Sequence, residues 1–180
     1  AVDRNVAIWI GTNSGLSRFD ALANEFRRID ALAGISIRSL LVDADGQIWI
    51  GSNESGVFQV DPQSFEAAVF THESANLGSD RVNVLYEDGD GRIWAGTTEG
   101  LSLWMPGGER FMTFHSDPTD PASLSDANII SIFQDRGGIV WFGTLTGGVN
   151  KWNPRSWSFG HSRLHFHDDS EVSSQNITSF

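Results

Sequence analysis

Ile8-Trp9-Ile10-Gly11 is the first of four similar stretches, and the others are Ile48-Trp49-Ile50-Gly51, Ile93-Trp94-Ala95-Gly96 and Val140-Trp141-Phe142-Gly143. The steps between successive Trp residues are 40, 45 and 47 residues. Self-similarity at a period of about 40 to 50 residues is typical of proteins that stack one small unit many times. We therefore interpret the 180-residue chain as an array of repeats.

The repeat extends on both sides of the Trp residues. An Asp stands six residues before each of them, at Asp3, Asp43, Asp88 and Asp135. A Leu stands seventeen residues before the last three, at Leu32, Leu77 and Leu124. Agreement at several fixed offsets indicates a structural unit and not one recurring dipeptide.

Each unit is predicted to hold four short strands. The inner strands, at 37–42, 82–87 and 129–134, are rich in β-branched and aromatic residues, which half-buried strands prefer. A turn of the type Asp-x-x-Gly follows and leads back into the Trp stretch as an antiparallel second strand. The third strand stops before Pro62, Pro106 or Pro154, because proline cannot donate to the ladder. The outer strands are expected at 65–70, 111–114 and 164–166.

Four strands in a unit of this length indicate a β-propeller blade. The predicted fold is an all-β, single-domain propeller fragment of about four four-stranded antiparallel blades, with approximate limits of 1–31, 32–76, 77–123 and 124–171, and an inner strand alone in 172–180. The first blade lacks its inner strand. The segment 177–180 aligns with the inner strands, because Val172 stands five residues before Ile177 as Leu77 stands five residues before Val82. It has no other strands of its own blade in this sequence. We expect 177–180 to pair with the edge of the Trp9 strand, within one chain or between two chains.

The repeated Trp residues are predicted to form the apolar core between blades. One blade cannot cover both of its faces, so its neighbours must cover them. A Trp side chain buries about 150 to 250 Å², which makes Trp9, Trp49, Trp94 and Trp141 the natural contacts. The Gly two residues later lets the adjacent backbone approach where a Cβ would clash, at Gly11, Gly51, Gly96 and Gly143. Trp104 and Trp152 are expected to pack between outer strands, whereas Trp157 lies outside the repeat.

Composition excludes several classes of function. A formal net charge of −11 argues against nucleic-acid binding, which needs clustered Lys and Arg. The absence of Cys excludes disulfides, Cys-ligated zinc and thiol catalysis. The sequence has neither a signal peptide nor an apolar run long enough to span a membrane. It begins inside a repeat, which we interpret as the sign of a longer protein.

The motifs of the repeat resemble a known family. Residues 43–52 and 135–144 join an Asp-x-x-Gly turn to the Trp strand, Gly147 to Lys151 continue the second of them, and residues 117–125 form a matching connector. This combination is similar to the two-component regulator propeller repeat, from which the first unit departs at Asn5-Val6. The resemblance implies the periplasmic sensor region of a bacterial inner-membrane receptor with a kinase or diguanylate cyclase as output. It also implies a small molecule or oligosaccharide as ligand, and no cofactor.

The candidate ligand contacts come from the geometry of a propeller, in which two sets of loops share one rim. These are the loops before the inner strands and those between the second and third strands. Their polar side chains are Asn53, Glu54, Arg81, Asn83, Glu99, Asn128, Thr146 and Asn176. Such side chains can hydrogen-bond sugar hydroxyls, and they are equally what a solvated loop contains.

No catalytic residue and no metal site is predicted, and two further classes of function stay open. The sequence has no nucleophile elbow and no phosphate-binding glycine loop. Two carboxylates from different loops would suffice for glycoside hydrolysis, so a propeller lyase or hydrolase is one alternative. A purely structural propeller that docks a protein or a second copy is the other.

Two motifs resemble metal sites. Asp43-x-Asp45 and Asp88-x-Asp90 are similar to the start of a calcium loop, with Glu54 and Glu99 at the twelfth position, but the Trp strand between them cannot wrap an ion. His161, His165 and His167 are of the residue type that binds zinc. However, His72, His115 and His167 each follow a repeat-aligned aromatic residue at the end of an outer strand, which indicates a recurring surface position.

Overall fold

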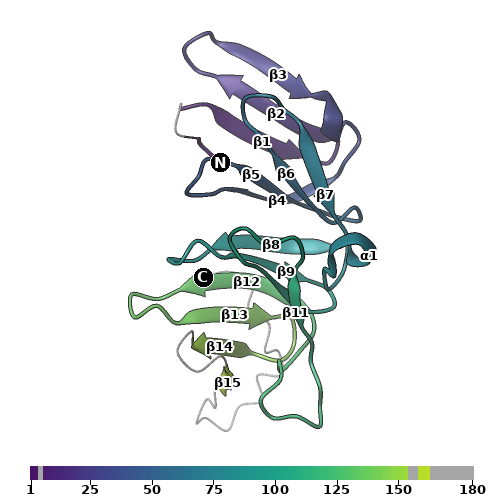
Figure 1. Ribbon diagram of the computed structural model, residues 1–180, viewed down its shortest axis with the longest axis vertical. Helices are drawn as coiled ribbons and strands as arrows, with labels where there is room; N and C mark the ends of the chain where they lie inside the picture. The colour runs from purple at the N-terminus through teal and green to yellow at the C-terminus, as the bar shows by residue number, and fades with distance from the viewer. Residues whose placement is uncertain (4–5, 154–157, 163–180) are drawn as a thin grey trace, which may run out of the picture.

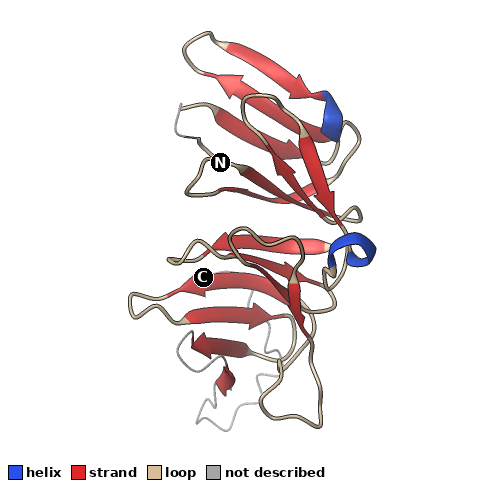
Figure 2. Ribbon diagram, in the orientation of Figure 1, coloured by secondary structure: helices blue, strands red, loops and turns tan. Residues whose placement is uncertain are grey.

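Four antiparallel sheets follow one another in chain order, from the top to the bottom of Figure 1. The computed structural model describes residues 1–3, 6–153 and 158–162, and strands dominate this part of the chain (Figure 2). The first sheet has three strands and the other three have four each. The predicted all-β propeller architecture is therefore confirmed, and the four blades form an open arc.

The strands have the following limits. Blade one contains β1 (Ile8–Thr12), β2 (Gly15–Asp20) and β3 (Glu25–Ile29), followed by a short 3-10 helix (Asp30–Leu32). Blade two contains β4 (Ile37–Val42), β5 (Ile48–Ser52), β6 (Val57–Val60) and β7 (Ala67–Phe70). A short helix, α1 (His72–Ala75), leads to blade three, with β8 (Val82–Glu87), β9 (Ile93–Thr97), β10 (Leu101–Trp104) and β11 (Met112–Phe114). Blade four contains β12 (Ile129–Gln134), β13 (Val140–Thr144), β14 (Val149–Asn153) and β15 (Ser158–Ser162).

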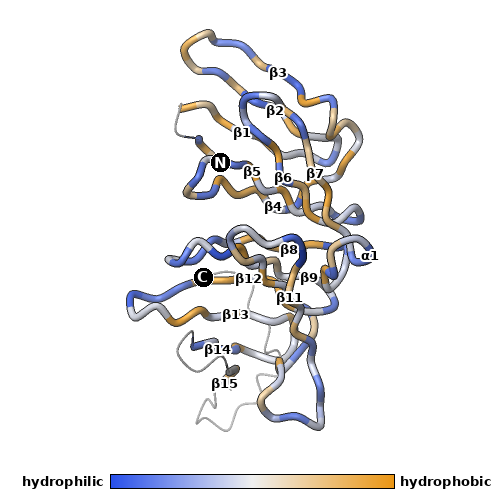
Figure 3. Tube along the Cα trace, viewed as in Figure 1, coloured by the Kyte–Doolittle hydropathy of each residue, from blue (hydrophilic) through white to orange (hydrophobic). Residues whose placement is uncertain are grey.

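The inner strands β4, β8 and β12 have the limits expected from the sequence. Each pairs antiparallel with the Trp strand of its blade, and each register shifts by one residue near its start. Residues that pair across two strands lie on the same face of the sheet. The residue opposite each Trp therefore shares its face. Figure 3 shows apolar residues, in orange, along the strands.

The outer strands differ from the prediction. β7 and β11 are shorter than the expected ranges 65–70 and 111–114, and Phe65 has a positive φ of 62°, before the start of β7. In blade four the outer strand is β15, at Ser158–Ser162, and not the range 164–166, which lies outside the described residues. β7 is exposed at three of its four residues, and no residue of β11 is fully buried. The outer strands therefore lack the buried apolar positions that identify an inner strand.

The turn before β1 is present as the sequence predicts, since the Asp3 amide donates to the Ala7 carbonyl and the Val6 amide donates to the Asp3 carbonyl, both at 3.0 Å. Ala1 and Val2 lie beside β1. Val2 forms an antiparallel bridge with Ile8, and the Trp9 amide donates to the Ala1 carbonyl at 2.8 Å. Among the described strands, β1 pairs with β2 alone. The expected partner of the β1 edge, 177–180, lies outside the described residues.

The Trp strands of blades one, two and three pack against the next blade, whereas Trp141 of blade four is partly exposed. Trp9 lies in a cluster with Ile48 and Ile50, Trp49 in a cluster with blade three, and Trp94 in a cluster with blade four. Trp104 and Trp152 belong to these clusters and meet Trp49 and Trp94 edge-on, with ring centroids 5.7 and 4.9 Å apart.

The Gly of the Trp strand permits this contact between blades. A Cβ on Gly51 would lie 2.7 Å from Val82 Cγ1, and one on Gly96 would lie 2.8 Å from Ile129 Cγ2. Carbon atoms in contact stand about 3.5 to 4.0 Å apart. A side chain at either position would therefore push the next inner strand away.

Candidate functional site

The turns between the inner strand and the Trp strand lie along one rim of the four blades, which we call the turn rim. In each blade the Asp of the turn accepts a hydrogen bond from the indole of the Trp six residues later. The distances from Nε1 to Oδ2 are 2.8, 2.7, 2.7 and 2.9 Å for Asp3, Asp43, Asp88 and Asp135. The Oδ1 atom of each Asp accepts backbone N–H groups of its own turn. One carboxylate thus orients both the turn and the core Trp.

The turn rim also joins neighbouring blades. The Ala44 amide donates to the Glu87 carboxylate of the next blade at 2.8 Å, and the Gly89 amide donates to Gln134 Oε1 at 2.8 Å. Burial and three nearby aspartates raise the pKa of Glu87 above its ordinary value, against the opposing effect of the Ala44 hydrogen bond. The turn rim is therefore engaged in holding the blades together.

The opposite end of the blades, which we call the loop rim, brings together the two sets of loops expected from the sequence. One backbone hydrogen bond recurs there, from the loop after the Trp strand to the residue before the inner strand. Asn53 donates to Ser36 at 2.8 Å, Thr98 to Arg81 at 3.2 Å and Leu145 to Asn128 at 2.9 Å. The backbone is repeated, and the side chains that it presents change from blade to blade.

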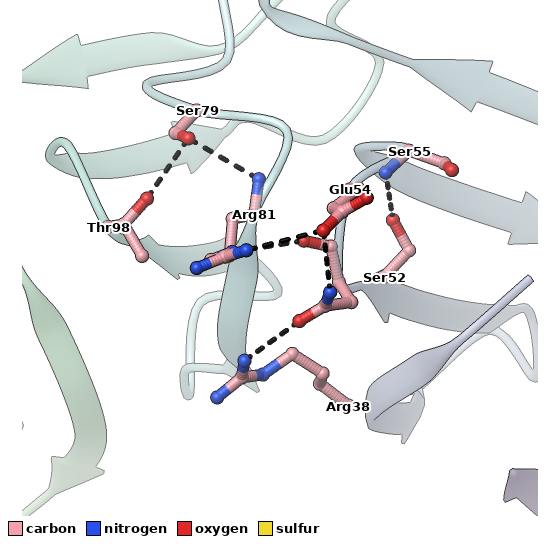
Figure 4. Close-up of polar contacts among 8 residues, drawn as sticks. Arg38, Ser52, Glu54, Ser55, Ser79, Arg81 and Thr98 are labelled. Carbon is pink, nitrogen blue, oxygen red and sulfur yellow. Dashed lines mark hydrogen bonds and ion pairs between the residues drawn. The ribbon is translucent and has the colours of Figure 1, made fainter. Parts of the chain in front are cut away.

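Blades two and three meet at the loop rim in a set of polar side chains that we call the rim cluster (Figure 4). Its members are Arg38, Asn53, Glu54, Ser79, Arg81 and Thr98. Arg38 Nη1 donates to Asn53 Oδ1 at 2.9 Å, and Arg81 Nε donates to the Asn53 carbonyl at 3.3 Å. Arg81 Nη2 lies 3.3 Å from Glu54 Oε1, and the two side chains are 48% and 73% exposed.

The second side of Arg81 is held by hydroxyl groups. Its amide donates to Ser79 Oγ at 3.3 Å, and Thr98 Oγ1 donates to the same oxygen at 3.1 Å. The cluster therefore combines two exposed guanidinium groups and one exposed carboxylate with one amide and two hydroxyl groups that are half-buried. Groups of this kind can bind hydroxyl or carboxylate groups of a ligand through several hydrogen bonds.

Blades three and four meet at the loop rim through a second set of polar contacts. Asn83 Nδ2 donates to Asn128 Oδ1 and to the Ile129 carbonyl, both at 2.9 Å. Thr146 donates to Asp126 Oδ2 from its hydroxyl at 2.6 Å and from its amide at 2.8 Å. Although burial raises it, the pKa of Asp126 is held below its ordinary value by the hydrogen bonds from Thr146 and the local backbone.

The structure brings together most of the predicted contact residues. Asn53, Glu54 and Arg81 meet in the rim cluster, and Asn83 contacts Asn128. Glu99 is exposed on the same set of loops, where its carbonyl lies 3.1 Å from His115 Nδ1. Asn176 and Trp157 lie outside the described residues.

Sequence reasoning missed four members of the loop rim. They are Arg38, Ser79, Thr98 and Asp126. Arg38 follows Ile37 as Asn83 follows Val82, so the repeat register was a signal that could have identified it. Thr98 stands four residues after its Trp, as Asn53 does, so it carried the same signal. Ser79 and Asp126 share the position two residues after the repeat Leu, and their contacts depend on local loop geometry.

The described residues contain no group of three or more His, Asp or Glu side chains arranged to hold a metal ion. His72 Nδ1 lies 2.7 Å from the Leu77 carbonyl. His165, His167 and the side chain of His161 are not among the described parts of the chain. No helix in the described part is long and apolar enough to cross a membrane.

Three repeats of the chain match the family model described as two component regulator propeller, at residues 31–54, 76–99 and 123–146. They cover the inner strand, the turn and the Trp strand of blades two, three and four. No curated protein matches the chain.

Several solved structures share the fold. The extracellular domains of the hybrid two-component systems BT3049 and BT4673 of B. thetaiotaomicron superpose with TM-scores of 0.71 and 0.67, at 23% and 24% identity. The matches cover 86% and 89% of this chain, but 21% of each of those chains. Virginiamycin B lyase from Staphylococcus aureus has a TM-score of 0.72 at 10% identity, over 93% of this chain and 55% of its own. The chain is thus a β-propeller segment in which three of the four blades carry the two-component regulator propeller repeat.

Proposed function

We propose that this propeller segment is the extracytoplasmic, ligand-sensing part of a bacterial signalling receptor, and that the rim cluster binds a small polyhydroxylated molecule such as an oligosaccharide. The observation that carries the proposal is the rim cluster itself. It gathers exposed charged side chains and half-buried hydroxyl side chains from two blades at the ends of several strands. Loops placed on a rigid scaffold in this way are the usual position of binding residues in proteins.

The family assignment supports this function and its location outside the cytoplasm. Two of the structures that share the fold are extracellular domains of hybrid two-component systems. By analogy, the signal from this segment would pass to a kinase or a diguanylate cyclase. A role in receptor assembly is compatible with the same surface.

We infer binding without catalysis. Glycoside hydrolysis needs two carboxyl groups about 5 to 10 Å apart across the substrate. In the rim cluster the single carboxylate, Glu54, is paired with Arg81. Asp126, the acid nearest to the second set of contacts, already accepts two hydrogen bonds from Thr146.

Calorimetry with a panel of neutral and acidic oligosaccharides tests the proposal on the full chain. The double variant Arg38→Ala, Arg81→Ala should abolish the heat of binding. The matched control is Arg136→Ala, an exposed arginine in a turn on the opposite rim, which should bind as the wild type does. Chromatography of each bound sugar after incubation detects turnover.

Binding that both variants retain would remove the rim cluster from the site. Shortened products would show an enzyme and overturn the proposal of a sensor. A panel without any binder would contradict recognition of a sugar.

A further inference from the structure

One of the two guanidinium groups in the rim cluster has no acidic partner. Arg81 is paired with Glu54, at 3.3 Å between Nη2 and Oε1. Arg38 is exposed and forms no ion pair within the described part of the chain, where its Nη1 atom donates to Asn53 Oδ1 at 2.9 Å. The rim cluster therefore carries one more positive than negative charge, on a chain whose formal net charge is −11.

The two guanidinium groups lie close together because both bind the same residue. Arg38 donates to the side chain of Asn53, and Arg81 Nε donates to the Asn53 carbonyl at 3.3 Å. Figure 4 shows both groups on the same side of the cluster. A guanidinium has several N–H groups, and its planar fork matches the two oxygens of a carboxylate. Arg38 can therefore offer most of its N–H groups to an anionic ligand.

A pair of amides lies next to the rim cluster, between blades three and four. Asn83 Nδ2 donates to Asn128 Oδ1 and to the Ile129 carbonyl, both at 2.9 Å. Both asparagines are half-buried, and the other two amide atoms, Asn83 Oδ1 and Asn128 Nδ2, form no hydrogen bond to another described residue. One of these atoms accepts hydrogen bonds and the other donates them, as a sugar hydroxyl requires. We call Asn83 and Asn128 the amide pair.

The rim cluster and the amide pair are within reach of one ligand. Arg81 and Asn83 are two residues apart at the start of β8, a separation of about 7 Å along a strand. Asn128 immediately precedes β12, the next inner strand. Both sets lie between neighbouring blades of the arc, and neither involves the outward faces of the first and last blades.

We propose that the rim cluster and the amide pair bind an acidic sugar, with its carboxylate on Arg38 and Arg81 and its hydroxyl groups on Asn83 and Asn128. This inference rests on the proposed sensing function and narrows its ligand class. The single excess positive charge of the rim cluster matches the single charge of a carboxylate, whereas a phosphate carries about 1.5 to 2 negative charges at pH 7. A neutral sugar keeps the hydroxyl contacts but lacks the charge, so it binds more weakly.

Calorimetry on the full chain compares trigalacturonate and trimannuronate with the methyl ester of each. The ester keeps every hydroxyl group and removes the negative charge. Hydrogen bonds to charged groups are stronger than neutral ones, so at least one acid should bind about 10-fold or more tightly than its ester. Added salt should weaken the binding of the acid and have little effect on the ester.

Three single variants separate the two parts of the site. Arg38→Gln keeps a donor for Asn53 but removes the charge, and should lower the affinity for the acid about 10-fold with no change for the ester. Asn128→Ala should lower the affinities for acid and ester by the same factor. The matched control is Arg136→Gln, the same change at an exposed arginine of the turn rim, which should bind both sugars as the wild type does. Melting temperatures show that each variant is folded.

The outcomes distinguish the ligand class from the sensing function. Equal affinities for acid and ester, or a preference for the acid that Arg38→Gln retains, would overturn recognition of an acidic sugar and leave the proposed sensing function standing. An Asn128→Ala variant that binds both sugars as the wild type does would remove the amide pair from the site. Absence of binding by all the acids and all the esters would contradict both proposals.

Discussion

The turn rim and the loop rim are the two ends of the same blades, and they differ in what is repeated. At the turn rim the side chains repeat, since one Asp holds one Trp in all four blades. At the loop rim only a backbone hydrogen bond repeats, and Arg81 stands where another blade has Asn128 or Ser36. The comparison indicates that the turn rim maintains the fold, while the side chains of the loop rim are free to vary with function.

Asp88→Ala should produce the largest effect, because it removes the most connected carboxylate of the turn rim. Asp88 Oδ2 accepts from Trp94 Nε1 and from Arg92 Nε, both at 2.7 Å, and Arg92 is 7% exposed. The variant leaves the buried Trp94 indole without its acceptor and the Arg92 guanidinium with one carboxylate partner, Asp90 Oδ2 at 2.7 Å from Arg92 Nη2. A loss of this kind costs about 3 kcal/mol. Urea denaturation followed by Trp fluorescence measures the loss of unfolding free energy.

The control for this variant lies in an equivalent turn. Asp45 is exposed, and its backbone amide, not its side chain, makes the hydrogen bond within the turn. Asp45→Ala should change the unfolding free energy by no more than about 0.5 kcal/mol. Equal effects of the two variants would mean that the Asp–Trp pairs do not maintain the fold.

Gly96→Ala tests the seam between blades and should have the next largest effect. The new Cβ would lie 2.7 Å from Val84 Cγ1 and 2.8 Å from Ile129 Cγ2. Overpacking of this kind destabilises by about 1 to 3 kcal/mol. In the turn rim, Gly137→Ala would place its Cβ 3.2 Å from the side chain of Asp135, which can move aside. A melting temperature lowered by Gly137→Ala as much as by Gly96→Ala would contradict the close approach.

The fold was largely predictable because the residues that recur at fixed positions in the repeat are the ones that form its strands and turns. The Trp phrase, the Asp turn and the β-branched inner strands gave the limits of β4, β8 and β12. The bond from Asp to Trp was missed, since the sequence reasoning assigned the Asp to the turn alone. β15 was misplaced because an outer strand buries few residues, as β7 and β11 show, and so carries little apolar pattern.

The sequence predicted the rim on which the candidate site lies, but it did not predict which side chains contact one another there. The propeller resemblance placed Asn53, Glu54 and Arg81 on one rim, and the recurring backbone bond explains why. The partners of these residues depend on side-chain conformation in variable loops. The Ser79 hydroxyl, for example, accepts from the Arg81 backbone amide and from the Thr98 hydroxyl, and the repeat pattern does not predict these bonds.

The Glu87→Gln variant tests how much the negative charge of Glu87 lowers the stability of the folded protein. Burial and neighbouring aspartates raise the pKa of Glu87 in the folded protein, so the folded state binds more protons than the unfolded state between the ordinary and the raised pKa. Wild-type stability therefore falls as pH rises through that window. An amide can accept the same hydrogen bond, as Gln134 does from Gly89.

The variant should be more stable than the wild type at pH 7 by about 0.5 kcal/mol, a small value because solvent screens the half-buried carboxylate. The difference in melting temperature should vanish below about pH 4, where Glu is protonated. A variant that is less stable at pH 7 would show that the carboxylate itself, and not only an acceptor, is required.

Arg81→Ala should have the smallest effect on stability, although it removes the centre of the rim cluster. The ion pair with Glu54 spans 3.3 Å between side chains that are 48% and 73% exposed. Exposed pairs of this kind contribute about 0 to 1 kcal/mol, and salt weakens them further. We expect an unfolding free energy within about 0.5 kcal/mol of the wild type in urea denaturation. If Arg81→Ala destabilised the chain as much as Asp88→Ala does, the loop rim would also maintain the fold. That result would contradict the proposed role of the rim cluster as a binding site.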